Sequence, residues 1–265
     1  MHPKDFTDLA SSPNLISGIH NYCDRWCERC AFTSRCAVYA MEEADPDVDP
    51  ASRDITNDAF WKKLSAIFAE TKAMILAMAE ERGVDLSEEA LKAIGEQNEI
   101  DRRNARSHPL AKAAEEYAYG VTEWFEKESS KLDLVTDTPE ASKPTHKEDD
   151  EDEYVEVIRW YQFFIAAKLI RALMSSVDEE DYLTDDTARD SDGSAKAALI
   201  GIDRSISAWK LMYDSRRAEQ DEQSRMIKKW LLHLEQLRMS AEREFPGARD
   251  FIRPGFDEPS LDMLH

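Results

Sequence analysis

The sequence has little glycine and little proline: 8 glycines and 10 prolines among 265 residues. So few glycines argue against phosphate-binding glycine loops, frequent tight hairpins and doubly wound α/β folds, which need glycine at fixed positions. A basic excess is also lacking, because 34 Lys and Arg stand against 55 Asp and Glu, for a formal net charge of −21. This balance disfavours non-specific binding to nucleic acid or to an anionic membrane.

Long apolar runs are absent as well. The longest uncharged, apolar-rich run covers residues 160–167, which is far too short to span a bilayer. The N-terminus has no apolar stretch or cleavage site typical of a secretory signal. We therefore expect a cytoplasmic protein with no membrane segment, whose acidic surface would suit a protein partner. Its oligomeric state is left open.

Apolar residues recur with the period of an α-helix over most of the chain, and little of it alternates with period two. We expect an all-α protein whose antiparallel bundle of six to eight helices covers residues 54–245. Asn57 or Asp58 can start the first of these helices and Gly83 can end it. Its apolar stripe consists of Phe60, Leu64, Ile67, Phe68, Thr71, Met74, Ile75 and Met78.

Later helices follow the same pattern. Pro109 suits the first turn of one helix. The helix expected over residues 154–176 is apolar on most faces, so we place it centrally. Residues 246–265 carry three prolines and two glycines and are expected to form an extended tail, laid across the bundle by Phe251, Ile252 and Phe256.

Two acidic segments interrupt the helical pattern. Residues 133–152 hold eight acidic and two basic side chains, and residues 178–192 hold eight acidic and one basic. Like-charge runs with few apolar groups bury too little surface to order themselves, so we interpret both as flexible, solvated loops.

The most informative segment contains four cysteines within fourteen residues, at Cys23, Cys27, Cys30 and Cys36. On one helix the first three would fall within an arc of about 60°. Thr33 or Ser34 would then break the chain and start a second helix, with Cys36 in its first turn. We therefore predict a four-cysteine, metal-binding helix–loop–helix over residues 1–45, with all four sulfurs directed at one point.

Other interpretations of the cysteines are burial as small apolar side chains and two disulfides, which a reducing cytosol disfavours. Among metal centres, one compact run with unequal spacing favours a [4Fe–4S] cluster, with zinc as the alternative. Interleaved arginines, Arg25, Arg29 and Arg35, would offset the negative charge of a cluster. His20, three residues before Cys23, would be either a surface residue, a supporting group or an exchangeable ligand.

The spacing of Cys27, Cys30 and Cys36 is similar to that of the last three ligands in the cluster loop of endonuclease III-like glycosylases. This resemblance implies a spacing compatible with a [4Fe–4S] cluster, and nothing about DNA. Together, these patterns predict a metal-binding protein that holds a [4Fe–4S] cluster or a structural zinc through the four cysteines. Its role would be structural, redox-sensing or electron-transferring, and no catalytic residue is assigned.

A short motif supports an alternative function, that of a ribonuclease. Arg103, Asn104 and His108 form the pattern R-N-x3-H, which resembles the motif of HEPN-domain ribonucleases and covers six residues of the chain. The resemblance implies an all-helical, metal-independent ribonuclease, in which the arginine and histidine give acid–base and electrostatic help. The cysteine site would then be purely structural.

Overall fold

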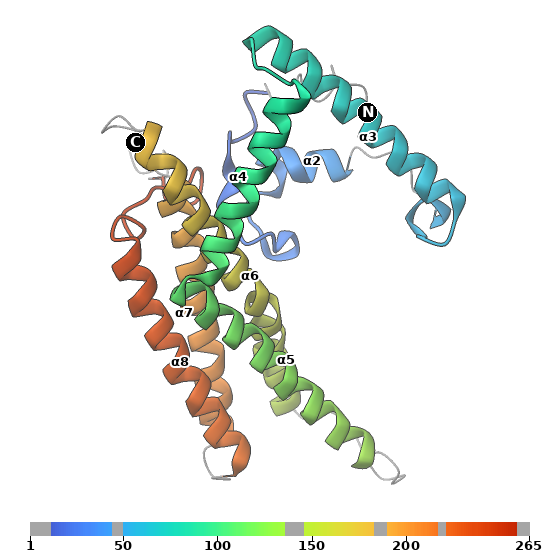
Figure 1. Cartoon of the computed structure of the whole chain (residues 1–265). Helices are drawn as coiled ribbons and strands as arrows, with labels where there is room; N and C mark the ends of the chain where they lie inside the picture. The colour runs from blue at the N-terminus through green and yellow to red at the C-terminus, as the bar shows by residue number, and fades with distance from the viewer. Residues whose placement is uncertain (1–11, 44–49, 136–145, 183–189, 217–220, 259–265) are drawn as a thin grey trace, which may run out of the picture. The chain divides into compact units, whose positions relative to one another are not determined.

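The structure, a computed structural model, describes residues 12–43, 50–135, 146–182, 190–216 and 221–258. This part of the chain has seven α-helices and no strand (Figure 1), so the predicted all-α class is confirmed. The helices are α2 (Ala37–Glu43), α3 (Asp58–Arg82), α4 (Glu88–Ser107), α5 (Pro109–Val135), α6 (His146–Tyr182), α7 (Asp190–Arg216) and α8 (Glu222–Glu244). Within the described residues, no helix has the length and apolarity that crossing a membrane requires.

The chain groups into two compact units. One consists of Met1–Asn98 together with Arg253–His265, and the other of Glu99–Ile252, so the division falls inside α4. The predicted domain boundaries stay predictions, because a division into compact units does not show which parts of the chain fold independently.

Helices α5 to α8 form an antiparallel four-helix bundle in the second unit. The most extensive packing is between α6 and α7, while α5 contacts α6 and α8, and α8 also contacts α7. Successive helices run in opposite directions (Figure 1). The predicted antiparallel bundle is thus confirmed for these four helices. Its core contains Tyr117, Val121, Ile158, Tyr161, Ile165, Leu169, Leu199, Ile202, Trp209, Ile227, Trp230 and Leu234.

Two aromatic side chains inside the bundle satisfy each other's polar atoms. Trp209 Nε1 on α7 donates a hydrogen bond of 2.9 Å to the hydroxyl of Tyr117 on α5. Both side chains are fully buried, and burial raises the pKa of Tyr117 to about 12. A buried donor left without a partner costs about 1–3 kcal/mol, so this bond favours a single register of α5 against α7.

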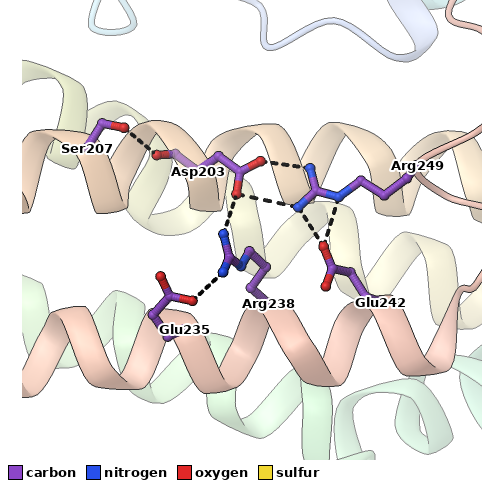
Figure 2. A network of polar contacts seen from close by, with 6 residues as sticks. All are labelled: Asp203, Ser207, Glu235, Arg238, Glu242 and Arg249. Atoms are coloured by element: carbon purple, nitrogen blue, oxygen red, sulfur yellow. Dashed lines mark hydrogen bonds and ion pairs between the residues drawn. The ribbon is translucent and has the colours of Figure 1, made fainter.

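An ion-pair network fastens the chain that follows α8 to the bundle (Figure 2). The guanidinium of Arg249 donates to Asp203 on α7 and to Glu242 on α8, each at 2.7 Å. Arg238 bridges Asp203 and Glu235. Because these side chains are 35–40% exposed, each pair contributes about 0.2–1 kcal/mol, and the main effect of the network is to position the chain after α8.

The described part of the C-terminal tail is irregular, with turns in place of a helix. Phe251 is buried in the second unit, and Lys196 Nζ donates a hydrogen bond to its carbonyl oxygen. Ile252 is 58% exposed, so the expectation that it packs on the bundle is wrong. Phe256 lies in the first unit, where it contacts Phe32.

Local signals set several helix ends where they were predicted. The side chain of Asn57 accepts a hydrogen bond from the Ala59 nitrogen at 3.0 Å and starts α3. Gly83 ends that helix with a φ of 65°, a left-handed conformation that glycine adopts without steric cost. Pro109 opens α5, where its missing N–H costs nothing.

The acidic segments are more helical than predicted. Residues 133–135 belong to α5, 146–152 and 178–182 to α6, and 190–192 to α7, so the loop assignment is wrong there. The remainder, 136–145 and 183–189, lies outside the described residues. Glutamate is a good helix former, and acidic residues in a first turn, such as Asp190 in α7, interact favourably with the helix dipole.

The apolar stripe of α3 forms as a helical pattern but lies at the surface. Ile67, Phe68 and Ile75 are 48%, 65% and 52% exposed, and Ala79 is the buried residue of this helix. The period of the sequence therefore predicted the helix correctly and its burial wrongly.

Replacing Gly120 by alanine tests the close approach of α5 and α8. A Cβ atom there would lie 2.3 Å from Cη2 of Trp230, a ring that is only 2% exposed. We expect Gly120→Ala to lower the free energy of unfolding by about 1–3 kcal/mol, because overpacking outweighs the better helix propensity of alanine. Urea denaturation followed by circular dichroism measures this change.

Gly95→Ala in α4 is the matched control, because nothing lies within 4 Å of a Cβ atom at that position. Helix propensity then acts alone, and the free energy of unfolding should rise by about 0.5–1 kcal/mol. If Gly120→Ala also raised the free energy of unfolding, the prediction would be wrong, because the Trp230 ring would then move aside at little cost.

Candidate metal centre

The cysteine segment is built from short 3₁₀ turns. These cover Ile19–Asn21, Cys27–Arg29 and Thr33–Arg35, and α2 follows. The predicted helix through Cys23, Cys27 and Cys30 is therefore wrong. The cause is local: Arg25 has a left-handed φ of 60°, which an α-helix cannot contain, and Asp24 Oδ1 accepts a hydrogen bond from the Trp26 nitrogen.

Three of the cysteines stand at the ends of these turns. Cys27 begins one turn, and the Cys30 nitrogen closes it by donating to the Cys27 carbonyl at 3.1 Å. The Cys36 nitrogen closes the next turn on Thr33, and the Cys36 carbonyl accepts from Ala40 in α2. Cys36 thus directly precedes the second helix, one position before its predicted place in the first turn.

All four cysteines line one small cavity, although they do not share a helix face. The cavity has a volume of about 20 Å³, and His20 and Arg25 also line it. This is room for about one water-sized sphere. Within the described residues none of the four cysteines forms a disulfide, and all four are half-buried. As the side chains stand, no three His, Cys, Asp or Glu residues among those described are arranged to hold a metal ion.

Hydrogen bonds differ among the sulfurs. The Phe32 nitrogen donates to Cys30 Sγ at 3.4 Å, a contact that favours a sulfur with negative charge. Cys23 Sγ instead donates to the carbonyl oxygen of His20, also at 3.4 Å. Backbone donors directed at sulfur are among the features that tune metal–thiolate centres.

Burial and neighbouring charges shift the pKa values of Cys27 and His20 in opposite directions, each toward the neutral form. Burial raises the pKa of the Cys27 thiol, and so do the carboxylate of Glu42 and the three other thiols. Burial also lowers the pKa of His20, helped by the positive charge of Arg25. A bound cation would reverse the first effect, because thiols ligate metals as thiolates and release their protons on binding.

The C-terminal segment of the same unit covers this region. The Phe256 ring lies edge-on to Phe32, with 5.0 Å between the ring centroids, and it also lines the cavity. Gly255 has a φ of 76°, and a Cβ atom there would lie 2.8 Å from Ile16 Cδ1. Residues 253–258 therefore belong structurally with the cysteine segment, and no pattern in the sequence indicates this.

The interleaved arginines are not equivalent. Arg25 lines the cavity. Arg29 stacks on the Trp26 ring at 4.1 Å, and Arg35 Nε donates to the carbonyl of Asn14. Of these three arginines, Arg25 is therefore the one placed to offset the negative charge that a bound cluster would have.

The residues of the HEPN-like motif lie at the junction of α4 and α5. Arg103 is exposed, and its Nε donates to the Glu99 carbonyl one turn earlier in α4. Asn104 is also exposed. His108 Nδ1 accepts from the Leu110 nitrogen, and its Nε2 lies 3.8 Å from Glu244. These contacts are those of a helix boundary, and the ribonuclease alternative stays a prediction.

No family model, no curated protein and no solved structure matches this chain.

The raised pKa of Cys27 predicts a measurable pH dependence. In the metal-free full chain, the pH at which iodoacetamide alkylates Cys27 at half its maximal rate should lie above that of the same residue in the urea-unfolded chain. The folded state holds this proton more tightly, so the stability contribution of the neutral thiol is lost as pH rises through its ionisation. Mass spectrometry of the Cys27 peptide gives both profiles, and coincident midpoints would contradict the burial argument.

Proposed function

We propose that Cys23, Cys27, Cys30 and Cys36 bind a metal centre that holds the N-terminal segment in shape. The observation that carries this proposal is the position of all four thiols around one small cavity. Four sulfur donors are the usual complement of both structural zinc and iron–sulfur sites. Because no three of the described groups are arranged to hold an ion as they stand, binding would require these side chains to move, to metal–sulfur distances of about 2.3 Å for zinc.

A structural role is favoured because this segment has little core of its own. Among residues 12–42, only Ile19 and Trp26 are buried apolar residues. Short segments with so little buried surface need a metal, disulfides or a partner to fold. Metal binding then contributes directly to the free energy of folding.

One observation supports each metal. The single compact run of cysteines with unequal spacing favours the [4Fe–4S] cluster. The cavity of about 20 Å³ favours zinc, because a single ion needs less rearrangement of the thiols than an iron–sulfur cube. Four cysteines without a disulfide in the described part of one segment suit a reducing, cytoplasmic location, and the net charge of −21 favours a protein partner over nucleic acid.

Metal analysis of the full chain, purified without oxygen, tests the proposal. We expect about four iron atoms with broad visible absorption, or about one zinc ion without colour, per chain. Cys27→Ala should lower the affinity for that metal more than about 100-fold, since it removes a direct ligand. Removing the metal with a chelator should expose residues 12–43 to limited proteolysis and leave the helical bundle intact.

Ser34→Ala is the matched control, because Ser34 is exposed in the same segment and does not line the cavity. It should bind the metal as the unchanged chain does. A wild-type chain that holds no more metal than Cys27→Ala would overturn the proposed function.

A further inference from the structure

His20 lines the cavity with its half-buried imidazole, which the four-cysteine proposal does not use. It lies in the 3₁₀ turn Ile19–Asn21 and lines the cavity together with the four thiols. Its Nδ1 atom is buried and has no hydrogen-bond partner. A buried polar atom without a partner costs free energy, which is offset only if something else, such as a ligand, meets it.

Cys23 differs from the other three cysteines in how the backbone holds it. Cys27, Cys30 and Cys36 stand at the ends of 3₁₀ turns that are closed by backbone hydrogen bonds. Cys23 lies between those turns, in an irregular stretch, and its thiol donates to the carbonyl of His20. The imidazole and the fourth sulfur therefore come from the same short stretch of chain.

We propose that His20 and Cys23 share the fourth ligand position of the metal centre, so that either can complete a set of three fixed cysteines. This inference rests on the proposed function. Three cysteines and one histidine form a common ligand set for zinc, and histidine in place of cysteine raises the potential of an iron–sulfur centre. Exchange at this position would change the charge of the centre by one unit without releasing the metal.

Other polar groups at the cavity are less suited to that position. Asp24, which also lines it, accepts a hydrogen bond from the Trp26 nitrogen. Thr33 takes part through its backbone in the turn that Cys36 closes. Neutral imidazole presents one nitrogen lone pair, which is the donor that borderline metals such as zinc accept beside thiolates.

Titration of the full chain with Co²⁺, in competition with Zn²⁺, measures the metal affinity and tests whether His20 and Cys23 share the fourth ligand position. Cys23→Ala and His20→Ala should each keep one metal per chain, with affinity within about tenfold of the unchanged protein. The double variant should lose more than about 100-fold. Cys36→Ala is the matched control, because it removes a fixed cysteine and should lose the metal although His20 and Cys23 are both present.

The Co²⁺ spectrum reads the ligands directly. The sulfur-to-cobalt charge-transfer absorption reflects the number of bound thiolates, so it should fall by about a quarter in Cys23→Ala and stay unchanged in His20→Ala. Cys23→Ala should also show nitrogen hyperfine coupling that the double variant lacks. If Cys23→Ala loses the metal as fully as Cys36→Ala, the sharing is wrong and the four-cysteine centre stands. If the unchanged chain binds no Co²⁺ and, when purified without oxygen, holds neither zinc nor iron, the proposed function itself fails.

Discussion

The N-terminal segment has too little buried apolar surface to fix its own conformation, and the interpretation of its cysteines depends on this constraint. Its two buried apolar side chains, Ile19 and Trp26, contrast with the bundle of α5 to α8, where aromatic and aliphatic residues from every helix are buried. Apolar burial stabilises the bundle without further ligands. In the cysteine segment the proposed metal centre would supply stabilising free energy through bonds to the four thiols that line one cavity.

Sequence reasoning succeeded where the cause is local or periodic. Asn57 and Gly83 mark the ends of α3 because a cap and a left-handed terminator act within one turn. The bundle was predictable because apolar residues at helical spacing must be buried against one another. All four cysteines line the same cavity. That their sulfurs converge on one metal stays a prediction, because no three of the described His, Cys, Asp or Glu residues are arranged to hold an ion.

The failures have physical causes that periodicity does not contain. The left-handed conformation of Arg25 replaces the expected helix by turns, although arginine gives no signal for it. The acidic ends of α6 were assigned to loops from charge alone, but these stretches of mixed Asp and Glu continue a helix whose centre is already packed. On α3 the spacing indicates which side chains share a face, and not whether another element covers them, so its exposed stripe was unpredictable.

Charge gives a reason for a fifth donor beside four thiols. A divalent ion with four thiolates keeps an excess of negative charge, which is costly in a partly buried site. Of the interleaved arginines, only Arg25 lines the cavity to offset it, because Arg29 stacks on Trp26 and Arg35 contacts Asn14. If the neutral imidazole of His20 replaced one thiolate, a single negative charge would remain on the centre, and the guanidinium of Arg25 would offset it. The unpaired Nδ1 of His20 and the sparse positive charge around the cavity are therefore two separate reasons why His20 could take the place of Cys23.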